Sequence, residues 1–214
     1  MFRSAFRSAL LASTLLACAG ASAAHAENRL ALVIGESAYR AVPSLPNPAN
    51  DARAMTRLLT DAGFAVTTAS DLSQRELNQK VGDFTAAIAA KGPDTVALVF
   101  YAGHGLQIDG ENYLVPVDVD PKREADIPLQ AVRLNDILNT LNSVPSRMRI
   151  LLLDACRNNP FATSKQTKGL AIVDAPTGSI VAYSTAPGTE ATDGSGADSP
   201  YTTASAGPWS PRAP

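Results

Sequence analysis

The chain has 214 residues, of which 45% are hydrophobic, and its 18 basic and 20 acidic residues give a formal net charge of −2. This balance provides no broad basic surface for nucleic acid, and no zinc-ligand spacing, phosphate-binding glycine loop or internal repeat occurs. The sequence therefore argues against nucleic-acid-binding, zinc-finger and repeat proteins. Its length suits one domain with its own core.

Residues 1–26 have the pattern of a secretory signal peptide. Two arginines within the first seven residues precede an apolar stretch over 9–19, and Ala24-His25-Ala26 precedes Glu27. This order of basic, apolar and small residues is typical of exported proteins. We therefore expect a mature chain that begins at Glu27 and is exported to the periplasm or beyond the cell.

The apolar stretch is shorter than the roughly 20 residues that cross a bilayer, so no membrane span is expected in the mature chain. An alternative is that Cys18 is a lipid-attachment site. With the signal removed, Cys156 is the one cysteine left, because the whole chain has 2. A disulfide within the mature chain is therefore excluded.

The first predicted elements alternate between strand and helix. An apolar run predicts a strand over 30–34, and a one-sided apolar pattern predicts a helix from about 50 to 62 that Gly63 terminates. A second strand is expected over 64–68. The apolar helix positions are Ala52, Met55, Leu58, Leu59 and Ala62.

A second helix is expected after Ser73, which can form a capping box with Glu76. Its apolar residues recur at helical spacing and are expected to lie in the core. They are Leu77, Val81, Phe84 and Ile88.

Two later apolar runs end at reactive side chains. Residues 95–103 lead to His104, and residues 150–155 lead to Cys156. Short runs of this composition predict strands buried on both faces of a parallel sheet, and ligands bind at the carboxyl ends of such strands. We therefore expect His104 and Cys156 at one rim of the sheet.

Between and after these runs the pattern continues. Asp109-Gly110 predicts a two-residue hairpin, four apolar residues over 134–141 predict a helix, and Ser179–Tyr183 predicts one more strand. Strands that alternate with helices indicate an α/β fold, with a mostly parallel sheet sandwiched between helices.

Four segments together resemble the caspase-like cysteine peptidases, the group that includes caspases, metacaspases and bacterial relatives. Tyr101-Ala-Gly-His104-Gly and Asp154-Ala-Cys156-Arg resemble the two catalytic motifs, and 30–35 and 47–53 resemble the first strand and the helix start after it. The histidine precedes the cysteine by 52 residues (104 to 156), against about 50 in caspases. The resemblance covers about 29–204 and implies the caspase-like three-layer α/β/α sandwich and action on peptide or protein substrates.

The resemblance implies a catalytic dyad. Cys156 is expected to attack the peptide carbonyl, and His104 to protonate the leaving amine and later activate water. The N–H groups of Gly105 and Cys156 are the expected oxyanion donors. Each residue considered alone also has a structural alternative. Cys156 is then a small buried apolar residue, and His104 is a loop residue hydrogen-bonded to backbone.

The resemblance to metacaspases also makes Asp154 and Asp51 substrate-binding residues, in a pocket for arginine or lysine. A partly desolvated carboxylate pair favours a cation. The alternatives are that Asp51 caps its helix and that Asp154 bonds nearby backbone. Arg53 or Arg157 could also neutralise the pair.

No cofactor is expected, although the acidic residues of 118–126 leave a calcium site open as a weaker alternative. The polar segment 163–169 suggests self-cleavage after Lys165 or Lys168, or else an ordinary solvated loop. The sequence gives no oligomeric state.

The peptidase domain is expected over 27–204, with an irregular proline-rich tail over 205–214. Similar proteins continue with a helix and a strand at this point, so the last strand of the sheet is expected to be missing. A silent caspase-fold module that binds peptides or partner proteins is therefore an alternative to the enzyme. A third is an acyl-transfer enzyme, such as an amidase or transpeptidase, with the same dyad.

Overall fold

The computed structural model describes residues 27–155, 169–186 and 196–206. The signal peptide, Cys18, Cys156, Arg157, the two lysines of the polar segment and most of the tail lie outside these residues. Within the described part, the main sheet has the strand order β2-β1-β3-β7-β8, and every neighbouring pair is parallel. The strands are β1 (Asn28–Gly35), β2 (Ala65–Ser70), β3 (Thr95–Ala102), β7 (Met148–Asp154) and β8 (Ser179–Tyr183).

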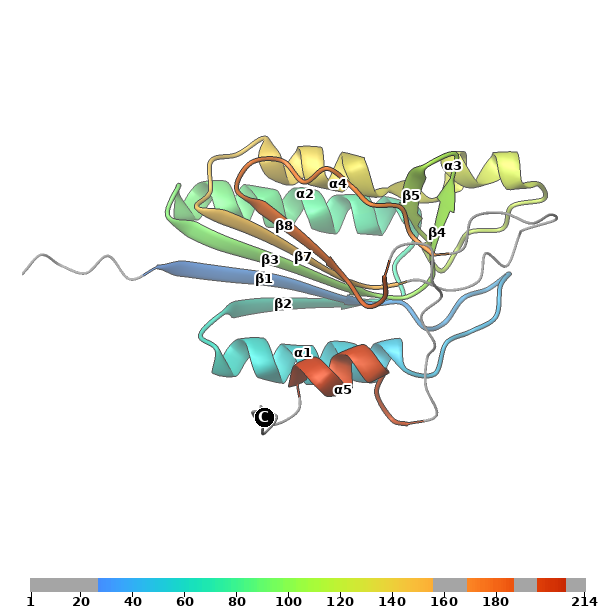
Figure 1. Ribbon diagram of the computed structural model, residues 1–214, viewed down its shortest axis with the longest axis horizontal. Helices are drawn as coiled ribbons and strands as arrows, with labels where there is room; N and C mark the ends of the chain where they lie inside the picture. Colours follow the sequence, from blue (N-terminus) through green and yellow to red (C-terminus); the bar gives the residue numbers. More distant parts are fainter. Residues whose placement is uncertain (1–26, 156–168, 187–195, 207–214) are drawn as a thin grey trace, which may run out of the picture.

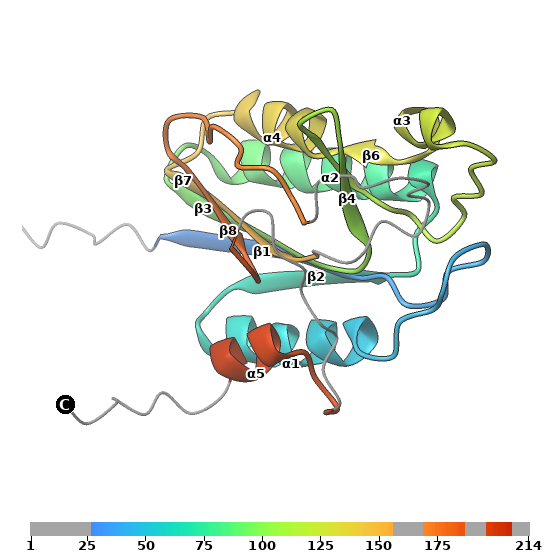
Figure 2. The ribbon, with the colours of Figure 1, turned by 45° about the vertical axis from the view of Figure 1, so that its right-hand side comes forward.

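Helices cover both faces of this sheet, as Figures 1 and 2 show. One face carries α1 (Pro48–Asp61) and α5 (Pro200–Ala206). The other carries α2 (Gln74–Lys91) and α4 (Leu134–Asn142). The predicted three-layer α/β/α sandwich is therefore confirmed.

Local sequence signals account for most of these elements. The capping box of Ser73 and Glu76 is present at the start of α2, and the predicted apolar stripe of this helix is buried. All eight residues of β3 are buried, as expected for a central strand between two helical layers. The fold thus directs the carboxyl ends of β3 and β7 to the same edge of the sheet.

A small antiparallel sheet lies at that edge, where the arrowheads of the main strands point in Figure 1. It contains β4 (Gly105–Ile108), β5 (Glu111–Leu114) and β6 (Val132–Arg133), and the short helix α3 (Ile127–Gln130) lies between β5 and β6 in the chain. The predicted turn joins β4 to β5, and Asp109 and Gly110 both adopt positive φ, 50° and 83°. Positive φ at both central residues is the requirement of a tight hairpin turn.

Several element boundaries differ from the prediction by one or two residues. Strand β2 begins at Ala65 and ends at Ser70, where a strand over 64–68 was expected. Helix α5 includes 205 and 206, the first residues of the segment expected to be irregular. Within the described part, no helix is both long and apolar enough to cross a membrane.

Candidate active site

The pairing of β3 with β7 brings the two reactive segments together. Ala102 and Asp154 are partners in this parallel pair, and the N–H of Gly103 donates to the Asp154 carbonyl at 3.3 Å. In the sequence, His104 comes two residues after Ala102, and Cys156 comes two residues after Asp154. Cys156 lies outside the described residues, but its chain neighbour Ala155 is fully buried at this rim.

Gly105 lies directly against Ala155. A Cβ atom on Gly105 would come within 3.1 Å of the Ala155 Cβ, so a side chain here would crowd the approach to the next residue. The carbonyl of His104 accepts a hydrogen bond from Val115 N at 3.0 Å. Because the peptide bond is trans, the Gly105 N–H points the opposite way, away from β5. This direction suits an oxyanion donor.

His104 is 5% exposed, and its imidazole is held by backbone. Nε2 lies 2.9 Å from the carbonyl oxygen of Pro43. A carbonyl oxygen only accepts, so Nε2 carries the proton and Nδ1 is the basic nitrogen of the neutral ring. The ring also contacts that of Tyr39, with centroids 4.5 Å apart at 58°. The loop between β1 and α1 therefore fixes the tautomer of His104.

The structure also brings Asp51 and Asp154 together, with 0% and 1% exposure. Ser199 lies between them: its N–H donates to Asp51 Oδ1 at 2.7 Å, and its hydroxyl donates to Asp154 Oδ2. Asp51 does not cap α1, because the N-cap of this helix is Asn47, without a side-chain hydrogen bond. The pair instead holds the start of α5.

Burial raises the pKa of Asp51 to about 6, and the nearby charge of Asp154 acts in the same direction. The Ser199 N–H acts against them and lowers the pKa. At neutral pH Asp51 is therefore mostly ionised, beside a second carboxyl group. Such a pair favours a cation over an anionic side chain.

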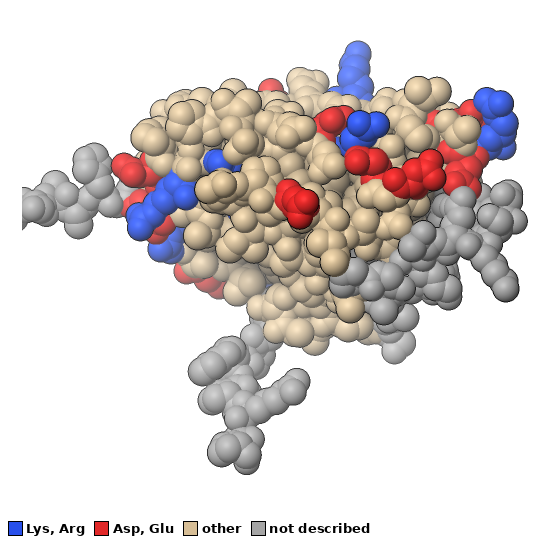
Figure 3. Space-filling model, turned by 45° about the horizontal axis from the view of Figure 1, so that its top comes forward, with Lys and Arg blue, Asp and Glu red and all other residues tan. Residues whose placement is uncertain are grey.

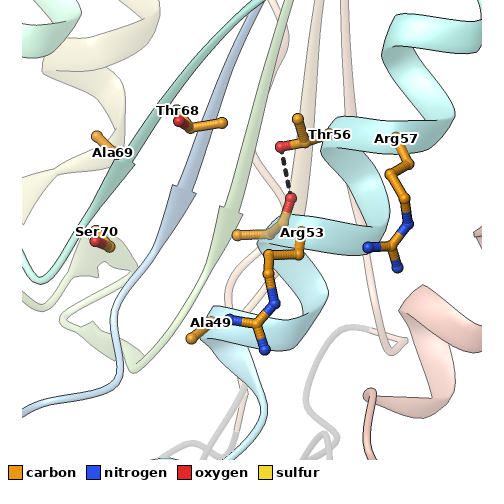
Figure 4. Close-up of a pocket in the computed structure, with 8 residues that line it drawn as sticks. Ala49, Arg53, Thr56, Arg57, Thr68, Ala69 and Ser70 are labelled. Atoms are coloured by element: carbon orange, nitrogen blue, oxygen red, sulfur yellow. Dashed lines mark hydrogen bonds between the residues drawn. The ribbon is translucent and has the colours of Figure 1, made fainter.

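Arg53 does not neutralise this pair. Its guanidinium donates to the Asn50 side chain and lines a groove of about 520 Å³ between α1 and β2 (Figure 4). Arg57, Thr68 and Ser70 line the same groove. The groove is thus separate from His104 and from the two buried aspartates, none of which line it.

The acidic residues considered for calcium are engaged with protein groups. Asp118 accepts from the backbone N–H of Gln74 at 3.0 Å, and Asp120 pairs with Lys122 at 2.8 Å. Figure 3 shows acidic side chains gathered at the α3 end of one face, with basic side chains beside some of them. No group of three or more possible metal ligands occurs in the part of the chain that the structure describes.

Comparison with known proteins decides the family. The model of the caspase domain matches residues 28–206. The chain belongs to the caspase family. Its caspase domain is 32% identical over 133 residues to the human mucosa-associated lymphoid tissue lymphoma translocation protein 1 (Homo sapiens), an alignment that covers 62% of this chain and 15% of that protein.

Caspase-1 of Sus scrofa is 29% identical to this caspase domain over 133 residues, which cover 60% of this chain and 31% of that protein. The chain thus spans less than a third of the length of either relative. A solved structure from Geobacter sulfurreducens aligns with 61% of this chain and 51% of its own, at 17% identity and a TM-score of 0.48. The family assignment therefore comes from the sequence matches.

Several residues of this caspase-domain site escaped sequence reasoning. Tyr39 and Pro43 contact His104, Ser199 joins the two aspartates, and Glu36 is buried beside Gly103. Three of these residues lie in the loop after β1, which has neither helical nor strand periodicity. Their one local signal is an aromatic residue and a proline just after a buried strand.

Proposed function

We propose that the protein is an exported cysteine endopeptidase that cuts peptide bonds after arginine or lysine with the dyad of Cys156 and His104. One observation carries the proposal. Both residues come two positions after strand partners, Ala102 and Asp154, in adjacent parallel strands. The bond from His104 Nε2 to the Pro43 carbonyl adds a base with a defined tautomer.

In the first half of the proposed reaction, the Cys156 thiol gives its proton to His104 Nδ1. The thiolate attacks the substrate carbonyl carbon, a C–S bond forms, and the carbonyl oxygen becomes an oxyanion. The N–H groups of Gly105 and Cys156 donate to this oxyanion. The C–N bond then breaks, and the leaving amine takes the proton from Nδ1.

In the second half, His104 takes a proton from water, and the resulting hydroxide attacks the thioester carbon. The C–S bond breaks, the acid product leaves, and the proton on His104 returns to the Cys156 sulfur. The side chains of the dyad exchange every proton themselves, so the proposed reaction uses no cofactor. The Pro43 carbonyl stabilises the imidazolium in both halves because it accepts from Nε2.

For the substrate residue before the cleaved bond, we propose recognition of a cation by Asp154 and Asp51. Asp154 ends β7, two residues before the nucleophile, and Ser199 joins it to Asp51. Asp51 Oδ2 is buried without a hydrogen-bond partner among the described residues, so this oxygen can accept a hydrogen bond from a substrate. A guanidinium or ammonium group would satisfy it.

The test measures hydrolysis by the full chain of peptides that differ only in arginine, lysine or aspartate before the cleaved bond. Cys156→Ala is the matched control, because it keeps the fold and removes the sulfur. Turnover of the basic peptides, lost in the control, is the expected result. Processing in a secreting host is followed by intact mass, and retention of residues 1–26 would contradict export.

Other outcomes overturn separate parts of the proposal. A preference for aspartate contradicts the role of Asp154 and Asp51 but leaves the dyad intact. Turnover of non-peptide amides alone points to an acyl-transfer enzyme of another class. A folded, monodisperse sample without turnover overturns the peptidase and leaves a caspase-fold module that binds peptides or partner proteins.

A further inference from the structure

Two tyrosine hydroxyls surround the backbone of His104. The His104 N–H donates to Tyr39 Oη at 2.7 Å. Tyr101 Oη donates toward the carbonyls of His104 and Val115, at 3.0 and 3.1 Å. Both hydroxyls also lie beside Gly103. The N–H and the carbonyl of His104 are thus each held by a tyrosine hydroxyl.

Counting protons fixes the direction of these bonds. Each hydroxyl has one proton, and the carbonyl oxygens accept only. Tyr101 therefore gives its proton to a carbonyl, and Tyr39 Oη accepts from the His104 N–H. Tyr101 is fully buried and Tyr39 is 7% exposed, so water does not compete for most of these bonds.

Gly103 makes room for the two hydroxyls. A Cβ atom at this position would lie 2.7 Å from Tyr39 Oη and 2.8 Å from Tyr101 Oη, closer than side-chain atoms approach. The glycine before His104 is therefore required by the two hydroxyls and not by a positive φ. Replacing it with alanine must displace at least one of them.

Tyr39 contacts the side chain of His104 as well as its backbone. Its ring packs against the imidazole, and Pro43, four residues later in the same loop, accepts from Nε2. This loop is itself anchored: Asp71 Oδ1 accepts from the N–H groups of Ser37 and Ala38, each at 2.8 Å. Tyr39 thus transmits the position of an anchored loop to the imidazole.

We propose that Tyr39 is a positioning residue for the catalytic His104, acting through its ring and through the hydroxyl that accepts from the His104 N–H, for which Gly103 makes room. The proposal rests on the proposed function only in that His104 serves as the base. Tyr39 takes no chemical step of its own in the proposed reaction. Its contribution is the orientation of the imidazole, on which proton transfer depends.

The test compares Tyr39→Phe with the wild type in full chains that carry Cys18→Ser, so that Cys156 is the one thiol. The variant keeps the ring and removes the hydroxyl. Loss of one neutral hydrogen bond corresponds to about a tenfold effect, so kcat for basic peptides is expected to fall about tenfold with KM unchanged. Tyr113→Phe is the matched control, since Tyr113 is also buried, in the same apolar cluster as Tyr39, and stacks with Arg133 instead.

Two further measurements do not depend on peptide hydrolysis. The alkylation rate of Cys156 against pH reports its pairing with His104, and Tyr39→Phe is expected to move this profile toward that of a free thiol, near pH 8.5. Amide hydrogen exchange at His104 is expected to become about tenfold faster, while core amides of β3 keep their rates. Gly103→Ala is expected to produce the same pattern.

The outcomes separate the two proposals. An active wild type whose kcat, alkylation profile and His104 exchange are unchanged by Tyr39→Phe overturns the positioning role alone. Faster exchange at every amide also overturns it, because the hydroxyl then serves general stability. A wild type without peptidase activity overturns the proposed function, and the exchange at His104 still decides whether Tyr39 holds it.

Discussion

Replacing Glu36 with glutamine is expected to stabilise the protein by an amount that grows with pH. Glu36 is 0% exposed, and its Oε2 accepts from the N–H of Leu72 at 2.8 Å. Oε1 is buried without a hydrogen-bond partner among the described residues. Burial raises the pKa of Glu36 to about 8, and the charges of Asp71, Asp118 and Glu76 add to the increase, although the Leu72 N–H lowers it. The carboxyl group is therefore neutral in the folded protein at pH 7.

The magnitude follows from proton linkage. The unfolded chain has the ordinary pKa of 4.5, so Glu36 must take up a proton when the chain folds above that pH. Its favourable contribution is complete below pH 4.5 and is lost as the pH rises to 8. At about 1.36 kcal/mol per pKa unit, the loss is about 3 kcal/mol at pH 7 and about 5 kcal/mol above pH 8. Glutamine has nearly the same shape, can accept from Leu72 and does not ionise, so it avoids this loss.

The assay is urea unfolding of both proteins between pH 4 and pH 9. The free energies of unfolding are expected to agree at pH 4, and the variant is expected to exceed the wild type by about 3 kcal/mol at pH 7. In a thermal scan at pH 7 this is about 6–12 °C in Tm for a chain of this size. A difference that stays constant from pH 4 to pH 9 would refute the reasoning, because it would show that Glu36 has the same pKa in both states. Glu76→Gln, on the exposed surface beside it, is the matched control and is expected to show no such increase with pH.

Other residues give shorter predictions. Asp51 has a pKa of about 6 and is neutral below it, so kcat/KM for arginine peptides is expected to fall as the pH drops through 6. Asp51→Asn is expected to lose both this pH dependence and the preference for basic peptides. If the fall in kcat/KM near pH 6 persists in the variant, the assignment to Asp51 is wrong. Ser199→Ala removes the hydroxyl between two buried carboxylates and is expected to lower the free energy of unfolding by about 1–3 kcal/mol in urea; an unchanged midpoint would show that the contact contributes nothing. Gly82→Ala, in an open helix position, should raise that free energy by up to about 1 kcal/mol. Gly35→Ala, whose Cβ would lie 2.6 Å from the Pro48 carbonyl, should lower it by about 1–3 kcal/mol, and similar effects at the two glycines would argue against the packing seen here.

Local signals predicted those elements whose formation depends on nearby residues. The capping box of Ser73 and Glu76 involves residues three apart, and the Asp109-Gly110 turn involves two neighbours, so each pattern is complete within one short segment. The common rim of His104 and the cysteine strand was also predictable. Parallel strands necessarily bring their carboxyl ends to one edge.

Boundaries that depend on tertiary pairing were less accurate. Strand β2 extends to Ser70 because Ala69 and Ser70 pair with Ile34 and Gly35 of β1, and this strand shows no alternation since most of its residues are exposed. Helix α5 forms because Ser199 Oγ accepts from the third residue of the helix, Thr202, at 3.0 Å. The proline density that predicted an irregular tail applies only to residues after the helix.

The contacts that orient His104 were not predictable, and the reason is chemical. Pro43 acts through its carbonyl, a group that every residue has, so no side-chain type marks the position. Tyr39 and His104 are 65 residues apart, and a tyrosine near a strand end is as suitable for core packing as for a hydroxyl contact. Only the folded arrangement tells these roles apart. Because the loop after β1 supplies both contacts, substitutions there are expected to alter the environment of the His104 imidazole while the segments around His104 and Cys156 keep their sequence.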